Sequence, residues 1–200
     1  MIRFFYLLLL FSFNTNGATL LILGDSLSAS YGIEEEYGWV QLLEQEISPK
    51  FRIVNASVSG DTTGNGLARL PKLLKEFKPD YVLIELGAND GLRGHPLRII
   101  RSNITKMIAL CENYNAQPLL FGMKIPANYG SRYSKGFEEI YYNIAAMSQI
   151  PMMPFQFTDI ATTLDMIQAD GLHPSLKAQP IIKNRVKLFL MPILKIKTNP

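Results

Sequence analysis

Two apolar runs, each followed at once by a glycine loop, constrain the fold of this chain more than any other feature. Residues 20–23 and 81–86 are apolar apart from Glu85, as expected of strands that are buried on both faces of a sheet. Between and after these runs, apolar residues recur at helical spacing. Strands that alternate with helices of this length form a parallel sheet covered by helices. We therefore predict an α/β fold with three α/β/α layers and a flavodoxin-like parallel sheet of about five strands.

The predicted elements follow one another without a long interruption. We expect strands at residues 20–23, 51–54, 81–86, 119–125 and 152–157, the last weakened by Pro154. Helical faces are expected at residues 39–47, 67–77, 100–111, 137–144 and 182–189. The chain has 200 residues, 48% of them hydrophobic, and contains no repeat or low-complexity segment. Residues 18–200 are therefore predicted to form one domain.

Residues 1–17 have the pattern of a secretory signal peptide. Arg3 precedes an apolar stretch, residues 4–13, in which only Ser12 is polar, and Thr15 and Gly17 are small enough for the positions before a cleavage site. The stretch is too short to cross a bilayer, which takes about 20 residues. We therefore predict a periplasmic or secreted protein, with a retained amphipathic anchor as the alternative.

Charge and cysteine content exclude several partners and cofactors. The net charge is +3 and the basic residues are scattered, so no patch suited to nucleic-acid phosphates is present. The single cysteine, Cys111, fits a predicted helix core and excludes an intramolecular disulfide and lipid attachment after the apolar segment. No His, Cys, Asp or Glu cluster has metal-ligand spacing. We expect a monomer without metal, other cofactor or stable membrane anchor.

Three polar loops follow successive predicted strands and carry Ser26, Gly60 and Asn89. Loops at the carboxyl ends of parallel strands converge at one edge of the sheet, where such folds bind ligands. Taken alone, Ser26 is equally well explained as a helix N-cap, and Gly60 and Asn89 are better explained as a turn residue and a loop cap. A non-catalytic module that holds a phosphate in these loops is therefore one interpretation.

The two histidines decide whether Ser26 can act as a nucleophile, because a serine hydroxyl needs a base and imidazole is suited to that role. His95 lies in a loop with no partner pattern, whereas Asp170 stands three residues before His173. An aspartate at this spacing can bond the imidazole and stabilise its cation. We therefore favour His173 as the base and keep His95 as the alternative.

Four short segments, in order and spacing, resemble the motif blocks of the SGNH (GDSL) serine esterases. They are residues 24–28, 59–61, 87–90 and 170–173, and the resemblance runs from about Thr19 to the last predicted helix. It implies the SGNH hydrolase fold, Ser26 as nucleophile, and His173 as general base and then acid. It further implies that Asp170 orients His173, and that the oxyanion is held by the Ser26 and Gly60 N–H groups and the Asn89 side-chain amide. These reactions need no cofactor.

Residues 55–62, 66–71 and 125–130 are similar to one branch of that family, the broad-specificity bacterial thioesterases, lysophospholipases and arylesterases. The resemblance implies small-molecule acyl esters and thioesters as substrates, with Leu92, Ile125 and Tyr129 as tentative contacts of the acyl chain. The loop at residues 91–96 departs from the branch by its His-Pro pair. A glycan or cell-wall acetylesterase of the same family is the second enzymatic interpretation.

Overall fold

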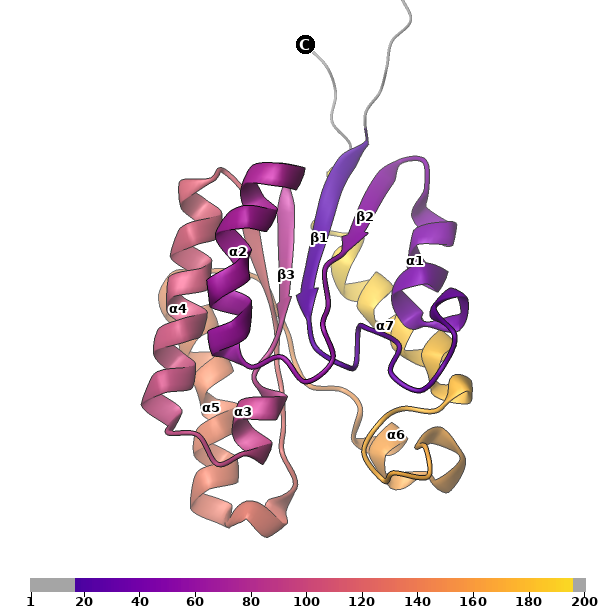
Figure 1. Ribbon diagram of the computed structural model, residues 1–200, viewed down its shortest axis with the longest axis vertical. Coiled ribbons are helices and arrows are strands. Elements are labelled where there is room, and N and C mark those ends of the chain that lie inside the picture. The colour runs from indigo at the N-terminus through magenta and orange to yellow at the C-terminus, as the bar shows by residue number, and fades with distance from the viewer. Residues whose placement is uncertain (1–16, 196–200) are drawn as a thin grey trace, which may run out of the picture.

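The computed structural model describes residues 17–195, and these form a five-stranded parallel sheet between two layers of helices (Figure 1). The strand order is β2-β1-β3-β4-β5. The strands are β1 (Ala18–Gly24), β2 (Phe51–Asn55), β3 (Tyr81–Glu85), β4 (Gln117–Phe121) and β5 (Met152–Met153). The predicted α/β fold is confirmed. The predicted signal peptide lies outside the described residues, apart from Gly17, and stays a prediction.

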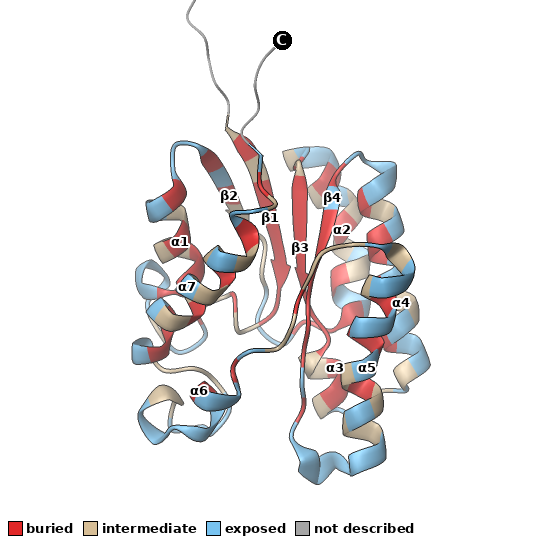
Figure 2. Cartoon of the chain, turned by 180° about the vertical axis from the view of Figure 1, so that it is seen from behind, coloured by how far each residue is buried: buried red, intermediate tan, exposed pale blue. Residues whose placement is uncertain are grey.

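Helices α1 and α7 cover one face of the sheet, and α2, α4 and α5 cover the other (Figures 1 and 2). The long helices are α1 (Trp39–Ile47), α2 (Thr63–Phe77), α4 (Leu97–Asn113), α5 (Ser131–Ser148) and α7 (Gln179–Leu190). The shorter ones are α3 (Ala88–Leu92), α6 (Thr158–Thr162), η1 (Glu35–Tyr37), η2 (Ala127–Tyr129), η3 (Leu164–Met166) and η4 (Leu176–Ala178). Within residues 17–195, no helix is both long and apolar enough to cross a membrane.

The central strands are the most deeply buried part of the molecule, because helices cover them on both sides (Figure 2). The side chains of residues 20–23 in β1 and 82–84 in β3 are fully buried. Cys111 is buried on α4, and burial raises the pKa of its thiol to about 12. This supports the packing interpretation of the cysteine rather than a reactive thiol.

The register of β1 and β3 builds the edge where the predicted site lies. Gly24, the last residue of β1, pairs with Glu85, the last residue of β3. Both strands therefore end at the same level, and the loops that follow them leave the sheet side by side. Segments that are about 60 residues apart in the chain meet here because parallel strands place their carboxyl ends at one edge.

Three elements differ from the prediction. The strand expected at residues 119–125 is β4, which ends at Phe121. The last strand comprises only Met152 and Met153, because Pro154 has no N–H group with which to continue the ladder. The loop predicted after β3 forms the short helix α3. Gly87 starts it with a φ of +121°, and a Cβ at this position would lie 2.1 Å from the hydroxyl of Tyr141. Glycine is therefore required where β3 turns into α3.

Candidate active site

Ser26 lies in the turn that follows β1, and this turn requires a glycine before it. A Cβ on Gly24 would lie 2.6 Å from Oε2 of Glu85 and 2.7 Å from Oγ of Ser57. Directly after Gly24, the turn is closed by a hydrogen bond from the N–H of Ala29 to the carbonyl of Asp25, at 3.0 Å. The serine is thereby held at the edge of the sheet, with its side chain toward the C-terminal loop.

His173 and Asp170 form a chain of hydrogen bonds that ends on Ser26. Nε2 of His173 is 2.9 Å from Oγ of Ser26, and its Nδ1 is 2.6 Å from Oδ2 of Asp170. The other oxygen, Oδ1, accepts the N–H groups of His173 at 3.0 Å and Leu172 at 2.9 Å. Hydrogen bonds from the backbone and side chain of His173 lower the pKa of Asp170 to about 2. Asp170 is therefore ionised at neutral pH, and Nε2 is left to accept the serine proton.

Tyr31 contacts the imidazole and was not anticipated from the sequence. Its ring centroid lies 4.3 Å from that of His173 with the planes tilted by 35°. The side chain of Gln168 ties the two segments together, because its amide donates to the carbonyls of Tyr31 and Pro174. An aromatic residue five positions after a serine carries no recognisable signal, and only the packing of the two loops brings it to the imidazole.

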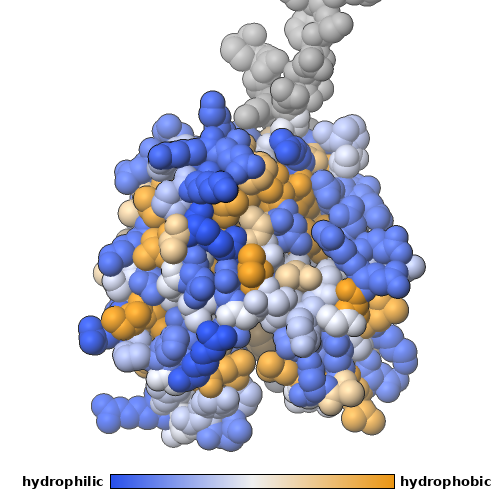
Figure 3. Space-filling view, viewed as in Figure 1, coloured by the Kyte–Doolittle hydropathy of each residue, from blue (hydrophilic) through white to orange (hydrophobic). Residues whose placement is uncertain are grey.

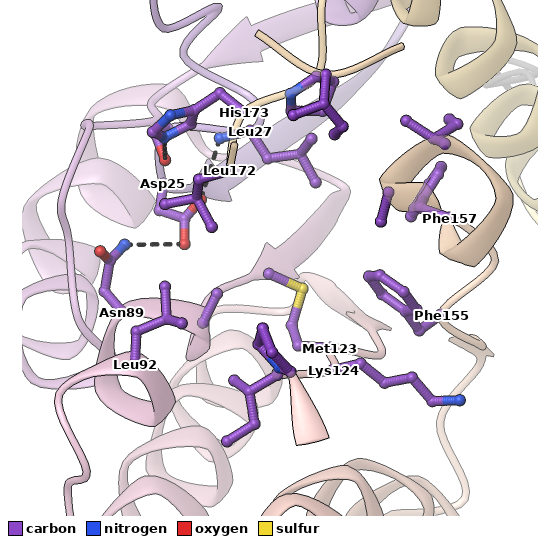
Figure 4. A pocket seen from close by; sticks show the side chains of 18 of the residues that line it. Asp25, Leu27, Asn89, Leu92, Met123, Lys124, Phe155, Phe157, Leu172 and His173 are labelled. Atoms are coloured by element: carbon purple, nitrogen blue, oxygen red, sulfur yellow. Dashed lines mark hydrogen bonds between the residues drawn. The ribbon is translucent and has the colours of Figure 1, made fainter. Parts of the chain in front are cut away.

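Asn89 presents its amide nitrogen at the same edge. Nδ2 donates to Oδ2 of Asp25 at 3.1 Å (Figure 4). It also donates to the backbone carbonyl of Asp61 at 3.1 Å. Both partners are acceptors, so they define which end of the amide faces them. Gly60 precedes Asp61 with a φ of +82°, and its carbonyl accepts a hydrogen bond from Arg93 at 3.2 Å. The structure thus brings Ser26, Gly60 and Asn89 to one edge, as the sequence predicted.

An apolar cavity of about 440 Å³ opens beside Ser26. It lies between the side of the molecule that carries α3 and the side that carries α6, and Figure 3 shows a hollow there with apolar side chains at its border. Leu92 and Ile125 line the cavity. Tyr129, predicted with them, does not: it lies on the short helix η2 with 40% of its surface exposed. Its assignment to the acyl-chain site therefore stays a prediction.

Several apolar cavity residues were not found by sequence reasoning. Met123, Phe155, Phe157 and Leu172 surround the space in Figure 4. The sequence predicts residues 155 and 157 as part of the last strand, at 152–157. Since the strand ends at Met153, they instead form a wall of the cavity.

Two acidic residues lie beneath the nucleophile. Asp25 is 2% exposed and Glu85 is fully buried. Burial raises the pKa of Asp25 to about 6. Burial, reinforced by the Asp25 carboxylate, raises the pKa of Glu85 well above its usual range. Residues 17–195 contain no group of three His, Cys, Asp or Glu side chains placed to bind one metal ion.

The fold and this edge of the sheet together place the protein among the α/β serine hydrolases. Residues 22–179 match the GDSL-like Lipase/Acylhydrolase family, and the chain belongs to this family. An "Arylesterase" of Vibrio mimicus is 46% identical over 188 residues, which cover 91% of this chain and 94% of the relative. The "Thioesterase 1/protease 1/lysophospholipase L1" of Escherichia coli is 42% identical, with 95% and 92% covered.

The solved structures agree with this family assignment. The psychrotrophic esterase EstA from Pseudoalteromonas sp., in a form inhibited by monoethylphosphonate, is 43% identical to this chain with a TM-score of 0.84. The match covers 87% of this chain and 97% of that chain. The alternative of a non-catalytic binding module is thereby set aside.

Proposed function

We propose that this protein hydrolyses acyl esters and thioesters, including acyl-CoA thioesters, lysophospholipids and aryl esters, through an acyl-enzyme on Ser26. The observation that carries the proposal is the hydrogen-bonded chain from Ser26 through His173 to Asp170, with contacts of 2.9 Å and 2.6 Å. The names of the arylesterase and thioesterase relatives support the range of substrates.

The reaction needs only groups that already lie in contact. Nε2 of His173 takes the proton of Ser26 while Oγ attacks the acyl carbonyl, and the Asp170 carboxylate stabilises the imidazolium. The imidazolium then donates the proton to the departing alcohol or thiol as its bond to the acyl carbon breaks. Water then attacks the acyl carbon while Nε2 of His173 takes a proton from it. The imidazolium returns that proton to Oγ of Ser26 as the bond from Oγ to the acyl carbon breaks, which releases the acid and free Ser26.

The negative oxygen of the tetrahedral intermediate is assigned to the N–H groups of Ser26 and Gly60 and to the amide of Asn89. Such donors supply a large part of the rate because they are oriented before the charge develops. Both amide hydrogens of Asn89 are engaged in the resting site. The oxyanion therefore shares one of them with its present acceptor or displaces that acceptor.

Replacing the nucleophile is the direct test. Ser26→Ala is expected to lower kcat by about 10³-fold or more without changing the fold, and to abolish labelling by a fluorophosphonate probe. Ser131→Ala, which removes an exposed serine at the start of α5, is the matched control and should keep full activity. Full turnover by pure Ser26→Ala protein would contradict the proposal.

The cavity favours acyl chains over acetyl groups. Its volume of about 440 Å³ and its lining of leucine, isoleucine, methionine and phenylalanine suit an apolar chain of several carbons. A graded series of p-nitrophenyl esters is expected to give a higher kcat/KM for medium chains than for acetate. A preference for acetylated sugars would instead support the acetylesterase interpretation.

We further propose that residues 1–17 direct export to the periplasm or the medium and are then removed, leaving a monomer. The apolar stretch at residues 4–13 supports this. Mass spectrometry of the exported protein should find a chain that begins near Ala18, and light scattering should give the mass of one copy.

A further inference from the structure

The two carboxyl groups beneath Ser26 are joined through the backbone of the nucleophile turn. Oε2 of Glu85 accepts the N–H of Asp25 at 3.2 Å and the hydroxyl of Ser28 at 2.7 Å. Oε1 of Glu85 is buried and has no hydrogen-bond partner among the described residues. A buried, unpartnered carboxylate oxygen is costly, whereas a protonated carboxyl carries no net charge.

No cation among residues 17–195 forms an ion pair with either carboxyl group. His173 and Asp61 act on the charge of Asp25, and Arg69 donates to the carbonyl of the preceding residue, Gly24. Arg69 is already bound to Asp61 and to two backbone carbonyls, and His173 is bound to its own aspartate. Two adjacent buried carboxyl groups without a cation cannot both be ionised, so the pair retains a proton. Glu85 is the more deeply buried, and its Oε1 has no hydrogen-bond partner in the described part of the chain whereas both oxygens of Asp25 accept hydrogen bonds, which places that proton on Glu85.

The ionised partner, Asp25, contacts the oxyanion donor directly. Its Oδ2 accepts from the amide of Asn89 at 3.1 Å, and its Oδ1 accepts the N–H of Leu27 at 3.1 Å. An ionised carboxylate can only accept hydrogen bonds, so it holds the NH₂ end of the amide toward itself. A protonated acid or an amide at this position would place a donor against Asn89 or Leu27. The orientation of the Asn89 amide would then depend on the Asp61 carbonyl alone.

We propose that Asp25 and Glu85 are positioning residues for the oxyanion donor: Glu85 retains the proton of the pair, and the Asp25 carboxylate keeps the NH₂ end of the Asn89 amide, rather than its oxygen, at the place where the oxyanion forms. The inference rests on the proposed function, because it requires Asn89 to stabilise an oxyanion. Neither carboxyl group takes part in proton transfer to the substrate. Their role parallels that of Asp170, which orients an imidazole where Asp25 orients an amide.

A double-mutant cycle tests whether Asp25 acts through Asn89. Asn89→Ala is expected to lower kcat by about 10²- to 10³-fold with little change in KM. Asp25→Asn should lower kcat by about 10- to 100-fold, again with KM nearly constant. In the Asn89→Ala background, Asp25→Asn should cost less than about twofold, because the amide that it orients is gone.

The matched control is Asp90→Asn. Asp90 is also buried and stands next to Asn89, but its oxygens accept from Thr63, whose hydroxyl can rotate and accept from an amide instead. This variant makes the same chemical change without touching Asn89, and kcat should stay within about twofold of the parent.

Glu85 is tested by its neutral isostere. Glu85→Gln should keep kcat within about threefold of the parent because it reproduces an uncharged side chain, while Glu85→Ala should lower kcat more strongly by loosening the turn. In infrared spectra at neutral pH, the parent should show the C=O band of a protonated carboxyl group that is absent from Glu85→Gln. This band does not depend on catalysis.

The outcomes separate this inference from the proposed function. Full activity of Asn89→Ala would overturn the oxyanion role and with it this inference. A large loss for Asn89→Ala beside full activity of Asp25→Asn, or additive losses in the double variant, would overturn the inference alone. A protonated-carboxyl band that persists in Glu85→Gln, or a loss of kcat as large as that of Glu85→Ala, would overturn the role given to Glu85.

Discussion

Two histidine–aspartate pairs lie at the same edge of the sheet, and only one of them faces a serine. In the first pair, His173 and Asp170 are 2.6 Å apart, and the second ring nitrogen lies 2.9 Å from Ser26. In the second pair, Nδ1 of His95 is 3.4 Å from Asp90. The carboxylate of Asp90 accepts hydrogen bonds from the N–H and the hydroxyl of Thr63, both at 2.7 Å.

The burial of the two pairs is reversed, and the reversal explains their different roles. The His173 side chain is 16% exposed and Asp170 is 38% exposed. The His95 side chain is 41% exposed, whereas Asp90 is only 2% exposed. The first pair therefore holds its imidazole in the site, and the second holds its carboxylate in the core with the imidazole toward solvent. Proximity of histidine and aspartate does not define a catalytic pair; what faces the other ring nitrogen does.

Removing each imidazole tests most directly whether the two histidines differ in catalytic role. His173→Ala is expected to lower kcat by about 10³-fold or more, because no other base contacts Ser26 in residues 17–195. His95→Ala should stay within about twofold of the parent. Steady-state kinetics with one thioester and one aryl ester measure both. A comparable loss for His95→Ala would mean that the second pair also serves the reaction.

Removing each carboxylate should separate activity from stability. Asp170→Asn is expected to lower kcat by about 10²- to 10⁴-fold, because the imidazole loses its orienting acceptor. Asp90→Ala should change kcat little but lower the free energy of unfolding by about 1–3 kcal/mol, since it leaves polar groups of Thr63 buried without this partner. Urea unfolding and kcat of both variants test this. Equal effects of the two variants on kcat would contradict it.

The imidazole of His173 has an aromatic neighbour and that of His95 has none among the described residues. Removing this neighbour is expected to lower kcat less than removing a histidine or an aspartate of the first pair. Tyr31 packs against His173, and no aromatic ring contact is found for His95 within residues 17–195. Tyr31→Leu is expected to lower kcat by about two- to tenfold, because a ring contact of this kind is worth about 0.5–1.5 kcal/mol. An unchanged kcat would show that hydrogen bonds alone hold the imidazole.

The smallest expected effect is on stability in acid. The folded protein holds the pKa of Asp170 at about 2, below its ordinary value of 3.8. Such a group stabilises the fold above pH 3.8, and this contribution is lost as the pH falls toward about 2. Asp170→Asn should therefore flatten the dependence of unfolding free energy on pH over this range. Solvent screens this exposed carboxylate, so the change is modest.

Much of the fold followed from patterns that are local in the sequence. The strands β1, β2 and β3 were placed within two residues at each end. For β1 and β3 this is because burial on both faces leaves apolar runs, and for β2 because its weak alternation stops at a small polar loop. The strands predicted to end at residues 125 and 157 were too long, since β4 ends at Phe121 and β5 at Met153; for β5 the local signal is Pro154, which has no N–H group. Tyr129 lies on η2, partly exposed and outside the cavity, so its contact with an acyl chain stays a prediction.

The contacts of the candidate site are likewise of two kinds: those between residues close in the sequence and those between distant residues. The contact of Asp170 with His173 spans three residues, so a single turn of backbone is sufficient to form it, and the spacing alone predicts it. The contact of His173 with Ser26 spans 147 residues, and the meeting of Asp25 with Glu85 depends on the register of β1 against β3. The hydropathy pattern and the covalent geometry of the chain determine the local secondary structure and the contacts between residues that are close in the sequence. Which distant groups meet, and therefore which carboxyl keeps its proton, depends on the packing of the sheet and its helices.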